Sequence, residues 1–267
     1  MFRPYDMHLH TDFSTDSQSP MEAVADEAVR KGLRGIAITD HYHPDYPNPV
    51  HRTGQPTPAY HRAMERLAQD YEGRLEVFRG LEMGILPGET MALCEAAARD
   101  YDYDFILGSF HSTRERTFDE LARDKRVSVE QAFRQYYEHV LLCITLFKDY
   151  DVLAHLNLLD RYAPYVPSDS LYTDVVDEIL RTAVADGKGL ELNTSCWRYG
   201  MGERTTPTAA ILRRYRELGG EFITVGSDAH QVKWVGDHLN EGYQFLRDLG
   251  WDYCVVYRHR KPCFVKL

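Results

Sequence analysis

Two short runs decide the fold: Tyr5-Asp6-Met7-His8-Leu9-His10 near the N-terminus and Gly226-Ser227-Asp228-Ala229-His230 near the C-terminus. Each closes a strand-like stretch and ends in two metal-ligating side chains separated by one residue. A strand points alternate side chains to the same face, so each pair is expected side by side. Four further apolar runs between them end in His41, Glu82, His111 and His155. Ligands at the downstream ends of successive strands are typical of a metal-loaded pocket at the C-terminal mouth of a β/α barrel.

The apolar pattern predicts strands that alternate with helices, which indicates a parallel sheet. The expected strands span 5–10, 35–41, 75–83, 105–111, 152–157, 189–194 and 222–228. Because nearly every strand supplies a ligand, a closed or nearly closed α/β barrel is favoured over an open sheet, which would gather its ligand at one switch point. We expect residues 1–267 to form one domain, with 251–267 as a C-terminal extension packed on the barrel.

The connecting segments carry helix and loop signals. Ser19-Pro20-Met21-Glu22 predicts a helix start, with Ser19 as the N-cap and Pro20 at the first helical position. The longest helix is expected over 129–148, and Pro207 is expected to open another. The proline-rich segment 44–58 follows a strand and predicts a long loop over the mouth of the barrel.

Composition narrows the classes of function. The 267 residues carry a formal net charge of −10, which disfavours sequence-independent binding of nucleic acid. The sequence has no apolar stretch of about 18 residues, so no membrane helix is expected. The N-terminus lacks the pattern of a secretory signal. The five cysteines are scattered without a CxxC pair, so a reducing cytoplasm is the expected location.

A buried group of imidazoles and carboxylates would be costly without a compensating charge, which metal cations supply. Each residue also has an ordinary alternative. The strand-end histidines could be core residues with one backbone bond, Glu82 could pair with Arg79, and Asp16 could cap a helix. We expect Asp16 to be a ligand because Ser19 already provides that cap. The expected metal ligands are His8, His10, Asp16, His41, Glu82, His111, His155, Asp228 and His230.

Two residues beside His41 are candidates for other roles. Asp40 either orients His41 or acts as an acid or base. His43 is a candidate for contact with the substrate, or simply a loop residue. The proton donor to the leaving group stays open between Asp40, His43 and a metal-bound water.

Arg161 and Arg198 follow the fifth and sixth strands and are expected at the same mouth. We interpret both as catalytic residues that bind phosphate oxygens with their forked donors. The alternative for Arg161 is a surface salt bridge with Asp160.

The chain resembles the PHP (polymerase and histidinol phosphatase) superfamily, and within it the histidinol-phosphatase branch. The segments that carry the resemblance are 6–11, 38–41, 80–84, 107–111, 154–156, 161–162, 191–195 and 226–230. The resemblance covers the chain end to end and implies a distorted (β/α)7 barrel with three divalent metal ions. By position, one metal would be held by His8, His10, Glu82 and Asp228, a second by Glu82, His111 and His155, and a third by Asp16, His41 and His230. The family's phosphate-binding arginines fall on Arg161 and Arg198.

The expected function is a metal-dependent phosphomonoesterase that hydrolyses L-histidinol phosphate to L-histidinol and phosphate, a step of histidine biosynthesis, by a hydroxide that bridges two metals. The mixed nitrogen and oxygen ligands admit Zn, Mn or Fe. The alternatives are a phosphatase of another small phosphomonoester, a phosphodiesterase or exonuclease of the same superfamily, and a metal-binding module without turnover. We expect a small phosphorylated metabolite as the partner, no nucleic acid or membrane, and a monomer or small homo-oligomer.

Overall fold

The computed structural model describes residues 3–267. Its parallel strands are β1 (Tyr5–Leu9), β2 (Gly35–Ile38), β3 (His41–Tyr42), β4 (Glu76–Gly84), β5 (Phe105–Ser109), β6 (Val152–Leu153), β7 (Gly189–Asn193) and β8 (Ile223–Gly226). They lie in the order β1, β2, β4, β5, β6, β7, β8, with β3 paired beside β4. His10 N donates to Ala229 O at 3.0 Å and Asp228 N donates to His8 O at 2.9 Å. These bonds join the first strand to the last, so the sheet curls into the nearly closed barrel that the ligand pattern predicts.

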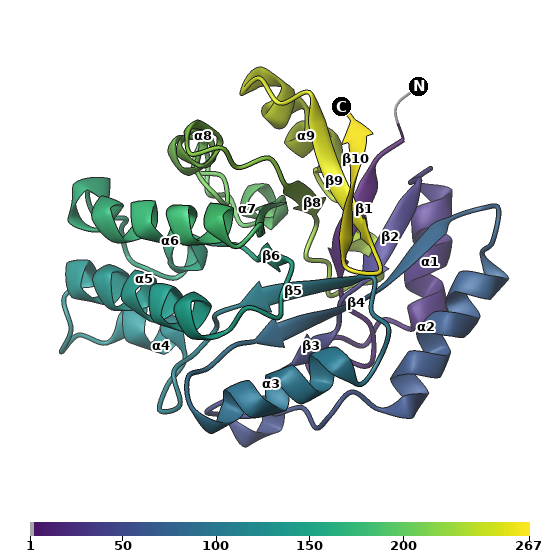
Figure 1. Cartoon of the computed structure of the whole chain (residues 1–267), viewed down its shortest axis with the longest axis horizontal. Helices are drawn as coiled ribbons and strands as arrows, with labels where there is room; N and C mark the ends of the chain where they lie inside the picture. Colours follow the sequence, from purple (N-terminus) through teal and green to yellow (C-terminus); the bar gives the residue numbers. More distant parts are fainter. Residues whose placement is uncertain (1–2) are drawn as a thin grey trace.

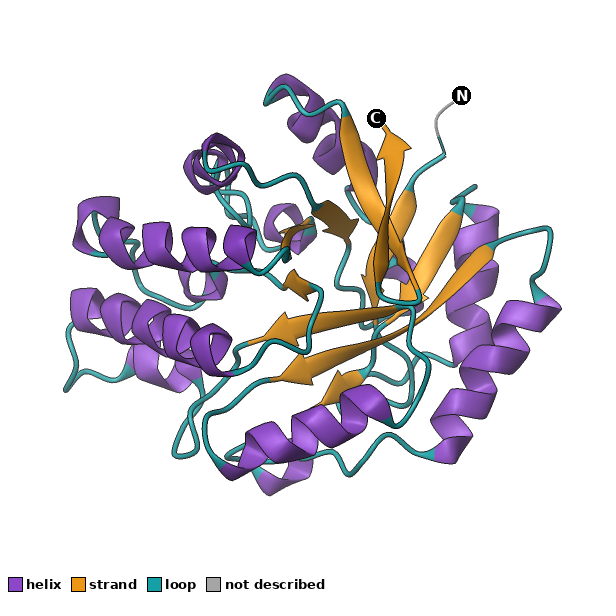
Figure 2. Cartoon of the chain, viewed as in Figure 1, coloured by secondary structure: helices purple, strands orange, loops and turns teal. Residues whose placement is uncertain are grey.

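Helices surround the barrel on its outer side (Figures 1 and 2). They are α1 (Met21–Arg30), α2 (Pro58–Asp70), α3 (Glu89–Arg99), α4 (Phe118–Arg123), α5 (Val129–Leu146), α6 (Thr173–Ala185), α7 (Ser195–Arg198), α8 (Ala209–Glu217) and α9 (Leu239–Asp248). Short 3-10 turns are η1 (Pro49–His51), η2 (Leu158–Arg161), η3 (Asp169–Leu171) and η4 (Val232–Trp234). Among residues 3–267, no helix is long and apolar enough to cross a bilayer.

An antiparallel hairpin, β9 (Tyr253–Arg258) and β10 (Lys261–Lys266), follows the barrel. Buried side chains of β9 pack in one cluster with Tyr5, Met7 and Phe105 from the barrel interior. The hairpin therefore covers the N-terminal end of the barrel and leaves the C-terminal end for the site.

An irregularity in β1 explains how one strand serves both ends. Asp6 pairs with Ile36 of β2 but Leu9 pairs with Ile38, so β1 holds one extra residue. A bulge of this kind reverses the face on which the following side chains lie. Met7 accordingly packs into the interior cluster, while His8 and His10 turn toward the mouth of the barrel.

Three local predictions need correction. α1 begins at Met21 without a side-chain cap, and the Ser19 hydroxyl instead donates to the carbonyl oxygen of His230 at 3.2 Å. Strand β6 ends at Leu153, four residues before the expected end at 157, because the backbone turns at His155, which has a positive φ. Pro207 precedes the helix cap rather than opening α8, since the hydroxyl of Thr208 accepts from the third helical N–H.

Candidate metal centre and active site

The C-terminal ends of the strands surround a cavity of about 290 Å³. Its lining comes from strand ends and from the segments that follow nearly every strand: Thr15, Asp16, His41, His43, Tyr46, His51, Glu82, His111, Asp119, His155, Leu158, Arg161, Tyr162, Tyr199, Asp228 and His230. The structure brings all nine predicted ligands to this end, with His8 and His10 fully buried beneath the floor. The expected loop 44–58 contributes Tyr46 and His51, so it does border the mouth.

One group of four donor atoms converges below the cavity. His8 Nε2 lies 3.0 Å from His10 Nε2 and 3.1 Å from Glu82 Oε2. Oδ1 of Asp228 lies 3.8 Å and 3.5 Å from the same two nitrogens. A tetrahedral ion with ligand bonds near 2.1 Å has ligand–ligand edges of about 3.4 Å. The four atoms therefore fit around one cation.

Two further triads have the same dimensions. His111 Nε2, His155 Nε2 and Glu82 Oε1 are separated by 3.2, 3.0 and 3.4 Å. His41 Nε2, His230 Nε2 and Asp16 Oδ2 are separated by 3.4, 3.2 and 3.3 Å. The last carboxylate is 40% exposed, so this triad is the most open of the three.

Glu82 joins two of these groups. Its Oε2 faces the group of four and its Oε1 faces the first triad. The predicted alternative, an ion pair between Glu82 and Arg79, does not occur, because Arg79 binds Asp104 at 3.0 Å. A carboxylate shared in this way is suited to bridging two cations.

The pKa values show that the buried site needs positive charge. Burial raises the pKa of Glu82, but His41, His8 and His111 lower it, and it ends well below its usual range. Burial lowers the pKa of His41, but Glu82 and Asp16 raise it to about 10. Without cations, protons on selected imidazoles balance the carboxylates. Divalent cations would replace those protons.

Backbone strain marks two of the ligand positions. His155 has φ of 26° and Asp228 has φ of 53°, although neither is glycine. Non-glycine residues adopt this region rarely and at a cost, and such residues cluster at functional sites.

Sequence reasoning missed a carboxylate behind the ligands. Glu191 Oε1 lies 2.6 Å from His8 Nδ1, and its Oε2 accepts from His155 N at 2.8 Å and from Asn193 Nδ2 at 3.2 Å. A carboxylate on Nδ1 fixes the tautomer that leaves Nε2 free to ligate. The signal was present in the sequence, because Glu191 and Asn193 are polar residues two apart inside an apolar strand.

Gly226 makes the contact between Glu191 and His8 possible. A Cβ at this position would lie 2.4 Å from Cβ of His8 and 2.7 Å from Oε1 of Glu191. No side chain fits there without displacing one of the two.

Asp40 is placed to orient ligands rather than to exchange protons with a substrate. Its Oδ1 accepts from Thr11 N and the Ser14 hydroxyl, both at 2.6 Å, and its Oδ2 accepts from the Thr11 hydroxyl at 2.8 Å. Ser14 Oγ in turn lies 3.1 Å from His10 Nδ1. Asp40 does not line the cavity. Of its two predicted roles, the geometry favours support of the ligands, through His10 rather than through His41 alone.

His43 lines the cavity and supports a ligand as well. Its Nε2 lies 3.0 Å from His111 Nδ1, which directs His111 Nε2 toward Glu82. Burial and the nearby His41 lower the pKa of His43 to about 3.

The two predicted arginines differ in their surroundings. Arg161 lines the cavity, with Nη2 3.7 Å from Asp228 Oδ2, and its expected alternative partner Asp160 binds Arg204 instead. Arg198 lies outside the cavity lining. Its Nη2 donates to the carbonyl oxygens of Ser227 at 3.1 Å and of Asp228 at 3.0 Å. The geometry therefore does not favour Arg198 as a phosphate-binding residue. It favours a structural role for Arg198, which we call a brace, in holding the backbone of Ser227 and Asp228 in place.

The outer part of the cavity is aromatic and acidic. Tyr46, Tyr162 and Tyr199 line it together with Asp119 from α4. None of these four was a predicted site residue, because Tyr46, Tyr162 and Tyr199 lie on loops and turns, Asp119 lies in a short helix, and only the folded chain sets their positions. His51, which sequence reasoning left on the surface, also lines this part.

Comparison with known proteins agrees with this architecture. The PHP domain family model matches residues 6–195. A probable histidinol-phosphatase of Clostridium acetobutylicum is 32% identical over 238 residues, covering 87% of this chain and 88% of that protein. A histidinol-phosphatase of Lactococcus lactis subsp. lactis is 28% identical over 242 residues, covering 87% of each.

Solved structures share the fold. The crystal structure of histidinol phosphate phosphatase from Lactococcus lactis subsp. lactis, complexed with Zn, L-histidinol and phosphate, matches with a TM-score of 0.87 and 24% identity. The match covers 98% of this chain and 99% of that chain. Since the family model spans most of the sequence and a relative above 30% identity covers most of both chains, this chain belongs to the PHP domain family.

Proposed function

We propose that the protein hydrolyses L-histidinol phosphate to L-histidinol and phosphate, as a step of histidine biosynthesis, with three divalent cations (Zn, Mn or Fe) bound at the site. The observation that carries the proposal is the set of three donor groups with cation-sized spacing on one cavity beside Arg161. The names of the relatives and the Zn, L-histidinol and phosphate in the Lactococcus enzyme support the same substrate.

The first cation would be held by His8, His10, Glu82 and Asp228, the second by Glu82, His111 and His155, and the third by Asp16, His41 and His230. When bound, such cations lower the pKa of water from about 15.7 toward about 7 and neutralise phosphate charge. Arg161 donates to the phosphate oxygens, and its planar fork suits two of them at once.

The residues also narrow the search for the proton donor. His43 has a pKa of about 3, so it is neutral at pH 7 and holds no imidazolium proton to give. Asp40 has three donors on its carboxylate and does not reach the cavity. Water within the cavity is the remaining candidate for protonation of the leaving alkoxide.

The outer cavity suits a cationic leaving group. Histidinol carries an ammonium group, and aromatic faces and carboxylates both attract cations. Asp119 accepts from the Thr117 hydroxyl, and its arginine partner, Arg123 at 3.4 Å, is on the same helix and largely exposed. We therefore assign Asp119, together with Tyr46, Tyr162 and Tyr199 of the same cavity lining, to the histidinol end of the substrate. The five unpaired cysteines fit the cytoplasm as the setting.

Phosphate release from metal-loaded protein tests the proposal. We expect kcat/KM for histidinol phosphate to be higher than for sugar phosphates, nucleoside monophosphates and p-nitrophenyl phosphate. Asp119→Asn should raise KM for histidinol phosphate about tenfold and leave p-nitrophenyl phosphate unchanged, since only the former carries a cation. Asp70→Asn, on the exposed end of α2, is the matched control. Rapid hydrolysis of the other esters with none of histidinol phosphate would remove the assignment.

A further inference from the structure

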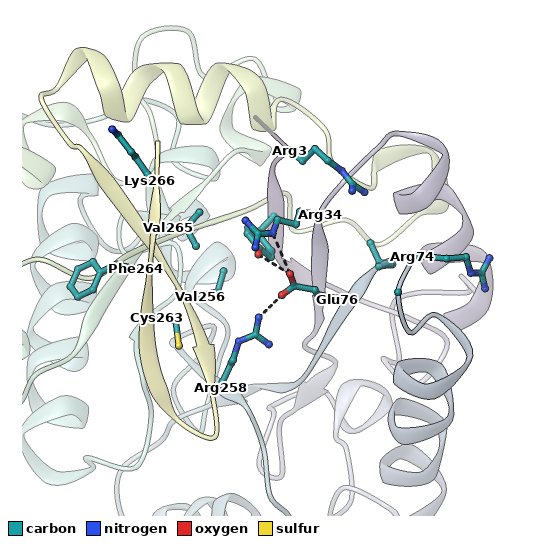
Figure 3. A pocket seen from close by; sticks show the side chains of 13 residues that line it. Arg3, Arg34, Arg74, Glu76, Val256, Arg258, Cys263, Phe264, Val265 and Lys266 are labelled. Atoms are coloured by element: carbon teal, nitrogen blue, oxygen red, sulfur yellow. Dashed lines mark hydrogen bonds and ion pairs between the residues drawn. The ribbon is translucent and has the colours of Figure 1, made fainter. Parts of the chain in front are cut away.

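A second, larger cavity lies at the opposite end of the barrel from the metal centre. Its volume is about 710 Å³, and it opens between the hairpin β9–β10 and the N-terminal ends of β1, β2 and β4 (Figure 3). The N-terminal end of a barrel ordinarily serves stability rather than chemistry. This cavity falls within the range of small-molecule sites, roughly 300–1,000 Å³.

The cavity is basic in an acidic protein. Arg3, Arg34, Arg74, Arg258 and Lys266 line it, and Glu76 is the carboxylate among its lining residues. Five cations against one anion give a local charge of +4 in a chain of net charge −10. Such a reversal concentrates anions at the site.

Two of the arginines are held in place before any ligand arrives. Glu76 accepts from Arg34 Nε at 3.2 Å and also binds Arg258 Nη2, and Figure 3 shows both guanidinium groups directed at this carboxylate. Arg34 lies over the ring of Tyr5 and Arg258 over the ring of Phe78, at 5.3 and 4.9 Å. Fixing both guanidinium groups reduces the entropy lost on binding.

The same arginines keep donors for a ligand. Within residues 3–267 each guanidinium uses one nitrogen for Glu76, which leaves N–H groups on its other two nitrogens. The side chains are 53% and 49% exposed, so a ligand can reach them. Val256 and Val265 of the hairpin, with Leu75, add an apolar wall.

We propose that this cavity, which we call the basic cavity, is a second ligand site that binds an organic phosphate, with the phosphate on Arg34 and Arg258 and an apolar or aromatic body against the hairpin wall. Paired arginines match phosphate geometry, and the space exceeds what a bare phosphate fills. The site stands on its own residues and does not depend on the reaction proposed for the metal centre.

The test uses the metal-loaded full chain and isothermal titration with the phosphonate analogue of AMP, whose carbon bridge cannot be hydrolysed as an ester. Inorganic phosphate and adenosine are the partial probes. We expect the analogue to bind more tightly than either, and Arg34→Ala or Arg258→Ala to weaken it about tenfold or more. Arg213→Ala, exposed on α8, is the matched control and should leave binding unchanged.

Arg161→Ala separates the two ends of the barrel. Binding that survives Arg161→Ala but falls in Arg34→Ala supports the basic cavity, whatever the enzyme hydrolyses. Loss in Arg161→Ala alone, or no binding at millimolar analogue, overturns the proposal. Equal affinity for phosphate and the analogue overturns the assignment of an organic ligand. Arg258→Ala removes the other guanidinium assigned to the phosphate, so it keeps the test valid if Arg34→Ala unfolds.

Discussion

Glu191→Gln is the most informative single change at the metal centre, because it alters the hydrogen-bond pattern without altering volume. Oε2 of Glu191 receives two donors, His155 N and Asn193 Nδ2. The one oxygen of a glutamine would remain on that side. Its NH₂ group would then face His8 Nδ1, 2.6 Å from Oε1 in the present structure. Two donors cannot share that contact, so the proton of His8 would move to Nε2, the atom that must ligate.

The expected cost follows from the loss of the correct tautomer. Changes in partners of metal-bound histidines lower metal affinity or activity by about 10–100-fold. That range corresponds to about 1.4–2.7 kcal/mol. Competition titration with a chelator would measure the affinity of the first cation, and kcat/KM on histidinol phosphate at limiting metal should fall in parallel.

Excess metal distinguishes the tautomer argument from misfolding. Activity of Glu191→Gln should recover partly as metal rises, and its melting temperature in chelator should stay near that of the parent. Glu178→Gln, exposed on α6, is the matched control. Unchanged metal affinity and unchanged kcat/KM in Glu191→Gln would refute the proposed control of the His8 tautomer.

Four further outcomes are expected. Arg161→Ala should lower kcat/KM by about 10–100-fold through loss of charge-assisted bonds to phosphate, with metal content by elemental analysis unchanged. Arg198→Ala should instead lower metal content, because it removes the hydrogen bonds to the carbonyl oxygens of Ser227 and Asp228 that support the strained backbone of Asp228. Full metal content with a raised KM would instead indicate that Arg198 binds the phosphate. Gly226→Ala should destabilise the fold by about 1–3 kcal/mol through overpacking, seen as a lower melting temperature. His41 has a pKa raised to about 10, so without metal it is protonated at pH 7. Metal uptake should therefore release protons, which titrations in buffers of different ionisation enthalpy would measure. The protonated His41 stabilises the metal-free fold fully below about pH 6.5, and this stabilisation is lost as pH rises through about 10.

The sequence alone determined the barrel and the set of ligand candidates. Strand period and the repeated placement of His, Asp and Glu at strand ends are local signals, and a parallel barrel collects all such ends on one rim. For this reason the strand pattern was enough to predict that His8 and Asp228, separated by most of the chain, are neighbours. Their positions at strand ends likewise predicted that Glu82 and His155 lie on the same rim.

Only the tertiary structure decided which atoms face which. The two oxygens of Glu82 serve different groups because β4 lies between β2 and β5, a relation that no local pattern encodes. The proposed roles of Glu191 in setting the His8 tautomer and of Arg198 in bracing Asp228 depend on contacts of β7 with β1 and of α7 with the end of β8. The basic cavity likewise joins Arg34 and Arg258 across 224 positions, and only the folded hairpin places their charges together. Local sequence fixes side-chain direction along an element, whereas distances between elements depend on packing of the whole barrel.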